Sequence, residues 1–213
     1  DILSQVAQVD QRPGLSPEEL VSVIGEYDGL MIRSGTQVTA AVIAAASRLK
    51  IIGRAGVGVD NVDVPAATQR GVLVVNSPEG NTIAAAEHAL AMMLTLSRHI
   101  PQAHAGMRAG KWDRKKYVGN ELYKKTLGVV GLGKIGSHVA RVAQAMGMEV
   151  IAYDPFIAAD RAQRMQVKLS ELDELFRSAD YVTLHIPRTK DTENLVNAEL
   201  LRTMKPTARI VNC

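Results

Sequence analysis

Short apolar runs alternate along the chain with stretches in which apolar residues recur every three or four positions. The runs predict strands, and the recurring pattern predicts amphipathic helices between them. Strands are predicted at 5–9, 29–33, 50–54, 72–75, 126–130, 149–153, 181–185 and 208–212. Helices are predicted at 17–24, 39–47, 64–70, 81–98, 134–146, 169–178 and 197–204. This order is typical of βαβ units, so the expected fold class is α/β with parallel sheets.

The pattern breaks at residues 76–80, where turn-forming residues precede a long helix rich in alanine and methionine. We expect a domain boundary here, with one domain over residues 1–77 and a second over 78–213. Both domains are expected to be doubly wound parallel-sheet structures. The sequence ends with a strand of the buried type, and the first residues of the chain resemble the tail of a helix. We therefore expect both domains to be incomplete in this stretch.

The composition is that of an ordinary soluble globular protein. Of the 213 residues, 46% are hydrophobic and 22% are charged, close to the average for folded domains. The one cysteine, Cys213, excludes an internal disulfide framework and a cysteine-rich zinc site, and it favours a reducing compartment such as the cytoplasm. We predict no metal site. The longest apolar stretch, 83–97, is interrupted by Glu87 and His88, so no membrane-spanning segment is expected.

Positive charge is concentrated between Arg98 and Lys125. This segment holds eight basic residues against two acidic ones, a net +6 in a chain whose total is +3, and Trp112, Tyr117 and Tyr123 are interleaved with it. Such a cluster can bind a single-stranded nucleic acid or a phosphorylated small molecule. A solvated or subunit-contacting arm explains it more simply, and we expect no nucleic-acid or membrane partner.

A glycine motif at residues 131–136, Gly-Leu-Gly-Lys-Ile-Gly, follows one predicted strand and opens a helix. This is the context of a dinucleotide-binding GxGxxG motif. Gly131 allows the tight turn, Gly133 lets the backbone approach a pyrophosphate, and Gly136 lets the helix pack closely on the strand. The phosphates are expected at the positive end of the helix, at Lys134 and Ile135.

An acidic residue stands where this type of site requires one. Asp154, followed by Pro155, ends the next predicted strand at about the 20-residue spacing expected. Its carboxylate can accept hydrogen bonds from adenosine ribose hydroxyls and repels a 2′-phosphate, which favours NAD over NADP. Two alternatives remain open: the glycines can tighten a turn without any ligand, or the site can hold S-adenosylmethionine, which also pairs a glycine loop with an acid.

Six further motifs occur in a fixed order along the chain. They are Arg33-Ser34-Gly35-Thr36, the run at 53–63, Asn76-Ser77-Pro78, Ala85-Ala86-Glu87-His88, the basic run at 111–117 and Val211-Asn212-Cys213. With them the chain resembles the D-isomer-specific 2-hydroxyacid dehydrogenases over its whole length. The resemblance implies a flavodoxin-like substrate domain and a Rossmann NAD domain, with the active site in the cleft between them. It also implies a dimerisation arm near 100–125, and therefore a homodimer or a higher homo-oligomer.

The resemblance also implies which residues bind ligands. Beyond the glycine motif, the cofactor would be bordered by His185, Ile186, Pro187, Cys213 and Val57. The substrate would be bound by Arg33, Ser34, Gly56, Val57, Gly58 and Asn76, with backbone amides of residues 55–58 at its carboxylate. Two glycines in that loop are chemically suited to an anion nest. The alternatives are a plain turn at 55–58, a surface arginine at 33, a turn asparagine at 76 and a structural histidine at 185.

As to activity, the resemblance implies NAD-dependent oxidation of a small 2-hydroxy acid. It is greatest to the members that oxidise D-3-phosphoglycerate to 3-phosphohydroxypyruvate, the first step of serine biosynthesis. Alternatives are a glyoxylate or hydroxypyruvate reductase, a D-lactate dehydrogenase, or a non-catalytic NAD-sensing corepressor. The arginine, glutamate and histidine that the family uses in catalysis would follow Cys213. We therefore assign no catalytic residue within this stretch and predict that it has no turnover alone.

Overall fold

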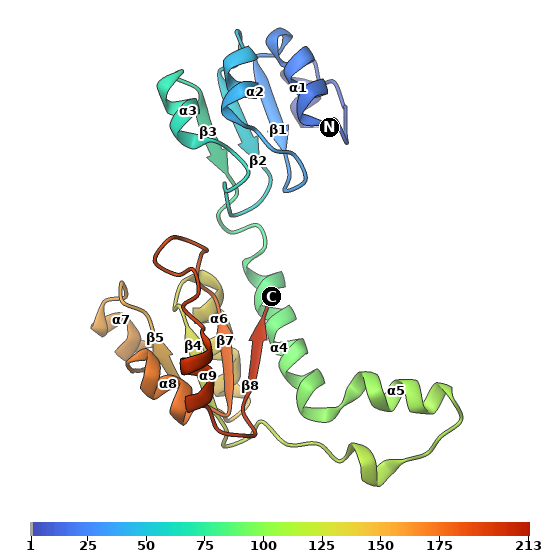
Figure 1. Ribbon diagram of the computed structural model, residues 1–213, viewed down its shortest axis with the longest axis vertical. Coiled ribbons are helices and arrows are strands. Elements are labelled where there is room, and N and C mark those ends of the chain that lie inside the picture. Colours follow the sequence, from blue (N-terminus) through green and yellow to red (C-terminus); the bar gives the residue numbers. More distant parts are fainter. Residues whose placement is uncertain (1) are drawn as a thin grey trace. The chain divides into compact units, whose positions relative to one another are not determined.

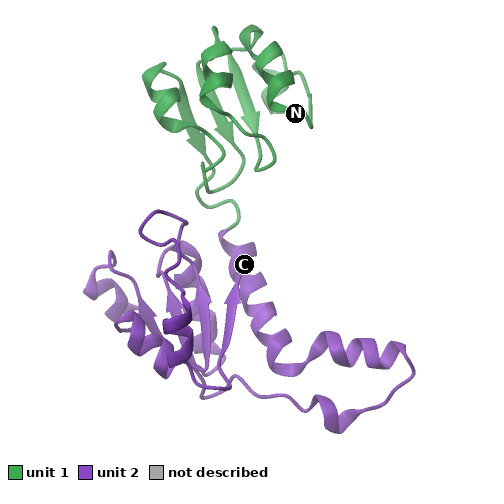
Figure 2. Ribbon diagram, viewed as in Figure 1, with its two compact units in different colours: residues 1–81 green, residues 82–213 purple. Residues whose placement is uncertain are grey.

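The computed structural model describes residues 2–213. They form two compact units, which meet in the sequence between Asn81 and Thr82 (Figure 2). Each unit contains its own parallel sheet and its own hydrophobic core. The α/β class with parallel sheets is thereby confirmed. No helix among residues 2–213 is both long enough and apolar enough to span a membrane.

The first unit is built on a three-stranded parallel sheet with the order β1-β2-β3. Its elements are η1 (Leu3–Gln5), α1 (Pro17–Val23), η2 (Ile24–Glu26), β1 (Gly29–Ile32), α2 (Ala40–Ala45), β2 (Ile51–Arg54), α3 (Val64–Gln69) and β3 (Leu73–Asn76). Local sequence explains where the helices begin. Ser16 and Glu19 form a capping box before α1, while Thr39 and Asp63 cap α2 and α3.

The strand predicted at residues 5–9 is wrong. The chain forms the short helix η1 there and then continues without regular structure, with Val6 83% exposed. A strand must pair its backbone N–H and C=O groups with a neighbour, and no described strand pairs with these residues. Apolar spacing alone therefore overstated the sheet at this end.

The sheet of the first unit is covered on one face. Leu20 and Ile24, of α1 and η2, and Ile43 of α2 pack with the strand residues Ile32 and Ile52 in one buried cluster. The other face carries large side chains that stay exposed within residues 2–213: Met31, Ile51, Leu73 and Val75. The strands pair in register, so these side chains form a continuous apolar face.

The second unit holds a five-stranded parallel sheet with the order β6-β5-β4-β7-β8 (Figure 1). Its elements are α4 (Thr82–Arg98), α5 (Ile100–Arg108), η3 (Arg114–Tyr117), β4 (Thr126–Val130), α6 (Lys134–Ala145), β5 (Glu149–Tyr153), α7 (Ala159–Arg164), β6 (Lys168–Leu169), α8 (Leu172–Ser178), β7 (Tyr181–Leu184), α9 (Ala198–Thr203) and β8 (Arg209–Asn212). Strand order reverses between β4 and β7. In open α/β sheets, ligands bind at the carboxyl ends of the strands beside this reversal.

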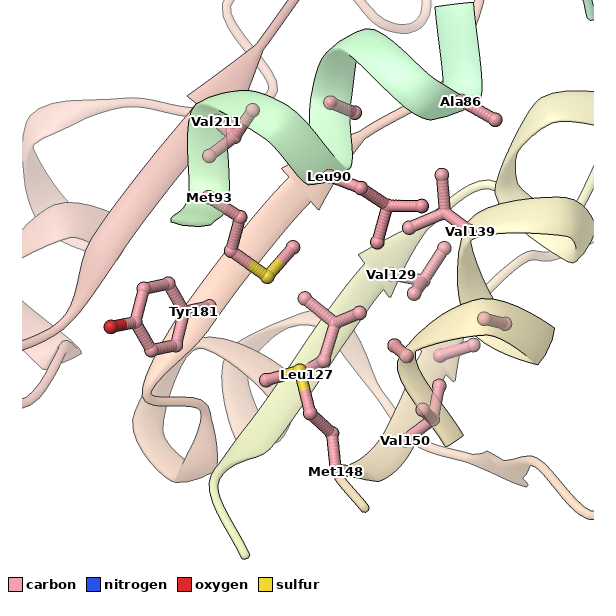
Figure 3. Packing of buried hydrophobic residues seen from close by; sticks show 14 of the residues in the cluster. Ala86, Leu90, Met93, Leu127, Val129, Val139, Met148, Val150, Tyr181 and Val211 are labelled. Atoms are coloured by element: carbon pink, nitrogen blue, oxygen red, sulfur yellow. The ribbon is translucent and has the colours of Figure 1, made fainter. Parts of the chain in front are cut away.

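Helices cover both faces of this sheet. On one face, Leu90 and Met93 of α4 and Val139 of α6 pack over Leu127 and Val129 of β4 (Figure 3). On the other face, buried residues of α8 and α9 pack against β4 and β7. The second unit is therefore doubly wound, as predicted.

The helix predicted at 169–178 begins too early. Leu169 pairs with Ala152 in the two-residue strand β6, and α8 starts only at Leu172. The amide of Ser170 donates to the Ala152 carbonyl at 2.8 Å and extends this pairing. A strand of two residues has no detectable periodicity, so only the tertiary pairing reveals it.

The segment between α4 and β4 extends away from the body of the second unit (Figure 1). Its helix α5 has no buried residue, and Trp112 beyond it is 72% exposed. The segment returns where the amide of Asn120 donates to the Ser97 carbonyl at 2.8 Å. Its two ends therefore lie close together. We call residues 100–118 the arm.

Candidate functional site

The strands of the second unit end at one level. Val130 of β4 pairs with Tyr153 of β5 and with Leu184 of β7, and Leu184 pairs with Asn212 of β8. The residues predicted to contact a cofactor in this unit all follow these strand ends. The fold therefore brings them to one edge of the sheet.

The three glycines of the motif have different surroundings. Gly131 has φ +92°, and a β-carbon there would lie 2.7 Å from the carbonyl oxygen of His185. A β-carbon at Gly136 would overlap the carbonyl oxygen of Gly131. At Gly133, by contrast, φ is −65° and a β-carbon would have nothing within 4 Å. Packing thus requires glycine at 131 and 136, whereas Gly133 leaves open space that a ligand can fill.

Helix α6 begins directly at this space. Gly133 is its N-cap, and no described side chain caps the helix. The first amides of a helix lack partners within it and carry partial positive charge. The turn is held in place because the Ser137 hydroxyl donates to the Leu132 carbonyl at 2.8 Å. The start of helix α6 is therefore placed to bind a phosphate.

Asp154 is fixed by three backbone amides. Its Oδ2 accepts from Leu132 at 2.8 Å, and its Oδ1 accepts from Phe156 at 2.9 Å and Ile157 at 3.1 Å. A carboxylate offers about four acceptor positions, so one is left for a ribose hydroxyl. Pro155, which lies between Asp154 and Phe156 in the sequence, is exposed. Open space at Gly133, the start of helix α6 and this carboxylate together fit a dinucleotide.

His185 lies beside the glycine loop. Its amide donates to the Val130 carbonyl at 2.8 Å, and its ring Nε2 is 2.9 Å from the hydroxyl of the buried Thr183. Burial lowers the pKa of His185 to about 4, so the ring is uncharged at neutral pH. The contact with Thr183 and the uncharged ring favour a structural role for His185 over proton transfer.

A cavity of about 370 Å³ opens at the carboxyl ends of β7 and β8. It is lined by Leu184, Ile186, Pro187, Arg188, Thr192, Glu193, Asn194, Leu195, Val196 and Asn212. Arg188 and Glu193 of the loop beside it form an exposed ion pair at 2.9 Å. The exposed Cys213 follows Asn212 directly. Ile186 and Pro187 thus line a hollow next to the glycine loop.

The three strands of the first unit also end in register, with Ile32, Arg54 and Asn76 side by side. The loop after β2 uses some of its amides internally: Ala55 donates to Ile32 and Gly56 donates to Arg54, both at 2.9 Å. The amides of Val57 and Gly58 donate to no described acceptor. The amides available to an anion are therefore those of Val57 and Gly58, and the amide of Gly56 is occupied.

The end of β3 holds this loop. The side-chain amide of Asn76 donates to the Val57 carbonyl at 2.6 Å, and the Ser77 amide donates to the Gly56 carbonyl at 3.0 Å. Asn76 therefore shapes the loop as well as standing beside it. Arg33 and Ser34 follow β1 at the same edge and are exposed, and Arg33 makes no ion pair with any described residue.

Two residues at this edge were not predicted. Arg54 ends β2 as a half-buried cation, and its Nε donates to Oδ1 of Asn61 at 3.2 Å. Asn61 is only 3% exposed and binds the carbonyls of Arg33 and Thr36. The signal for Arg54 was the same as that for Arg33, an arginine at the end of an apolar strand. For Asn61 the sequence carries no comparable signal.

The family comparison agrees with this geometry. The model of the NAD binding domain of the D-isomer specific 2-hydroxyacid dehydrogenases matches residues 90–213. D-3-phosphoglycerate dehydrogenase of Synechocystis sp. is 65% identical over 213 residues, which are 100% of this chain and 38% of that protein. The enzyme of the same name from Archaeoglobus fulgidus is 51% identical over 96% of this chain and 39% of that protein. The chain thus spans about two fifths of the length of these relatives.

Solved structures show the same likeness. The TT0316 protein from Thermus thermophilus matches with a TM-score of 0.88 at 34% identity, over 96% of this chain and 65% of that one. D-lactate dehydrogenase from Aquifex aeolicus, solved with NAD and lactic acid, matches with a TM-score of 0.83 at 30% identity, over 90% of this chain and 58% of that one.

Proposed function

This chain belongs to the D-isomer specific 2-hydroxyacid dehydrogenase family, and on that premise we propose that the protein carrying it oxidises D-3-phosphoglycerate to 3-phosphohydroxypyruvate with NAD. The reaction would be the first step of serine biosynthesis in the cytoplasm. The observation that carries the proposal is the 65% identity to a D-3-phosphoglycerate dehydrogenase, which extends over the whole chain and so includes both sheet edges.

The second unit supplies the cofactor site in this proposal. When bound, NAD accepts the hydride removed from the substrate carbon. The open space at Gly133 and the first amides of α6 receive the pyrophosphate. The remaining acceptor position of Asp154 binds a ribose hydroxyl, and its negative charge disfavours the 2′-phosphate of NADP.

The first unit supplies binding groups for an acid that carries both a carboxylate and a phosphate. The free amides of Val57 and Gly58 are suited to the carboxylate. Arg33 follows β1 and Arg54 ends the neighbouring strand β2, at the same edge of the sheet. A guanidinium can bind a phosphate through two parallel hydrogen bonds. Neither arginine has an acidic partner among residues 2–213. This positive edge favours a phosphorylated substrate over an unphosphorylated one.

The arm is proposed to mediate a homodimer. It exposes Ile100, Met107, Trp112 and Val118 on a segment with little contact to its own unit. Apolar side chains held away from the body of a unit are costly in water unless a partner covers them. A second copy of this chain, with its arm exchanged, would bury them.

A D-lactate dehydrogenase is the second candidate, because one solved enzyme of that name matches with a TM-score of 0.83. NADH formation by the full-length protein tests both candidates, with D-3-phosphoglycerate, D-glycerate and D-lactate as substrates and with NADP in place of NAD. Activity with the phosphorylated acid and NAD is expected. Equal or faster turnover of D-lactate would contradict the proposal. NAD binding without turnover of any acid would favour a sensing role.

A further inference from the structure

The buried side chain of Asn61 connects two loops at the carboxyl edge of the first sheet. Its Nδ2 donates to the carbonyl of Arg33 at 3.0 Å and to that of Thr36 at 2.6 Å, in the segment after β1. Its Oδ1 accepts from Nε of Arg54 at 3.2 Å, at the end of β2. One amide thus binds both segments on which the proposed anion-binding groups lie.

Chemistry determines the orientation of this amide. Two carbonyl oxygens can only accept, so they must face the NH₂ group, and a guanidinium can only donate, so it must face the oxygen. Both N–H donors and the oxygen are then in use. Because Asn61 is only 3% exposed, water cannot easily replace any of these partners.

The contact with Asn61 restricts Arg54. The bond at Nε leaves the two terminal nitrogens free, and Nη1 lies over Gly56, where a β-carbon would overlap it. The guanidinium is half-buried and makes no ion pair with any described residue. A flexible cation normally loses rotamer freedom when it binds an anion. Here the fold has already removed part of that freedom.

We propose that Asn61 is a positioning residue of the substrate site, which holds the guanidinium of Arg54 over the loop at Gly56 so that its terminal nitrogens meet the substrate anion. This inference rests on the proposed function. Asn61 does not touch the substrate in this arrangement and acts through Arg54. The same side-chain amide also holds the backbone at Arg33, because Nδ2 of Asn61 donates to the Arg33 carbonyl.

The experiment measures KM for D-3-phosphoglycerate, KM for NAD and kcat in the full-length protein and in Asn61→Ala. We expect KM for the acid to rise about tenfold or more, as for loss of a hydrogen bond to a charged group, with KM for NAD within about twofold of the parent value. Asp63→Ala is the matched control. It removes a helix cap two residues away, where Oδ1 accepts from the Ala66 amide at 3.0 Å, and it does not touch Arg54.

A double-mutant cycle separates positioning from general destabilisation. If Asn61 acts through Arg54, Asn61→Ala raises KM no further in a chain that already carries Arg54→Met. Multiplicative effects of the two changes would overturn the inference. So would an unchanged KM in Asn61→Ala, provided that the parent protein turns over D-3-phosphoglycerate. Absence of turnover by the parent would instead contradict the proposed function.

Arg54→Lys provides a test if Asn61→Ala cannot be purified. It leaves the two carbonyl contacts of Asn61 in place and keeps the positive charge, but a lysine lacks the Nε donor and the planar fork. The inference predicts a rise in KM of about tenfold or more for the acid. A KM within about twofold of the parent value would show that charge alone suffices and would overturn the inference.

Discussion

The backbone amide of Leu132 donates a hydrogen bond of 2.8 Å to Oδ2 of Asp154. The bond joins the second residue of the glycine motif to the acid at the end of β5, 22 positions further along the chain. The position of the phosphate-binding turn therefore depends on the same carboxylate that is proposed to bind the ribose. In the proposed site, one carboxylate thus serves both the geometry of the turn and the choice of cofactor.

Replacing Asp154 by Asn should weaken NAD binding and relax selection against NADP. The amide has one acceptor oxygen for three backbone N–H groups, and the negative charge facing a 2′-phosphate is gone. We expect kcat/KM for NAD to fall about tenfold. The ratio of kcat/KM for NAD to kcat/KM for NADP should fall by at least as much. The exposed Asp160, which pairs with Arg164, gives the control variant Asp160→Asn. An unchanged cofactor ratio in Asp154→Asn would count against the ribose assignment.

Two of the motif glycines, Gly133 and Gly136, should behave differently when each is replaced by alanine. Gly133→Ala meets no protein atom within 4 Å, so the free energy of unfolding should change by less than about 0.5 kcal/mol while the dissociation constant for NAD rises about tenfold. Gly136→Ala overlaps the Gly131 carbonyl and should destabilise the unit by about 2 kcal/mol. Urea denaturation and NAD titration measure the two quantities. If Gly133→Ala binds NAD normally, the pyrophosphate is not at this turn.

His185 should make the protein less stable as the pH falls from about 6.5 toward 4. Burial lowers its pKa to about 4 in the folded state, against about 6.5 when unfolded, so the unfolded chain binds more protons in this interval. The contribution of His185 to the free energy of unfolding is fully present above about pH 6.5 and is on the order of 3 kcal/mol. The difference in urea midpoint between pH 7.5 and 5 should shrink in His185→Gln. The exposed His104 gives the control His104→Gln, and equal pH dependence in parent and His185→Gln would contradict this assignment.

Tyr181→Phe should lower stability without changing cofactor affinity. Its hydroxyl lies 2.8 Å from Oγ of the buried Ser97 on α4 and accepts from Nη1 of Arg209 on β8 at 2.8 Å. Removing it leaves these partners poorly satisfied, at a cost of about 1 to 2 kcal/mol. Tyr181 begins β7, whereas the glycine loop adjoins the other end of that strand, so the NAD dissociation constant should not move. Tyr123→Phe, at an exposed ring, is the control.

Removing the arm should convert the proposed dimer to monomers. The amide of Asn120 reaches the Ser97 carbonyl, so the ends of the arm are close enough for a short Gly-Ser linker to replace residues 100–118. Sedimentation velocity on the full-length protein then reports the oligomeric state, and the melting temperature checks that the variant is folded. A folded variant that remains a dimer would show that the arm does not hold the subunits together.

Local chemistry explains what could be predicted at the second sheet edge. The order of strands and helices, the long helix α4 and the turn at Gly131 each depend on residues that are near one another in the chain. The glycine motif and Asp154 could be interpreted together because their spacing is characteristic of one supersecondary unit. The separate roles of Gly133 and Gly136 also follow from that unit, and the surroundings of both residues agree with them.

Contacts between distant segments account for what could not be predicted. The spacing at residues 5–9 suits a strand, but no described strand lies beside it, and β6 exists only because β5 offers it a partner. The loop at 55–58 was expected to present several amides, yet Ile32 and Arg54 occupy two of them.

The sequence by itself therefore determined the fold class and the dinucleotide motif, since these follow from periodicity and from short spacings. Its ordered motifs also carried the resemblance to the family. Tertiary structure alone decided which amides remain free at the first sheet edge and which side chain orients Arg54. Those outcomes depend on the register between strands and on which buried polar groups find partners. Asn61 meets Arg33 and Arg54 only after three separate segments have packed together.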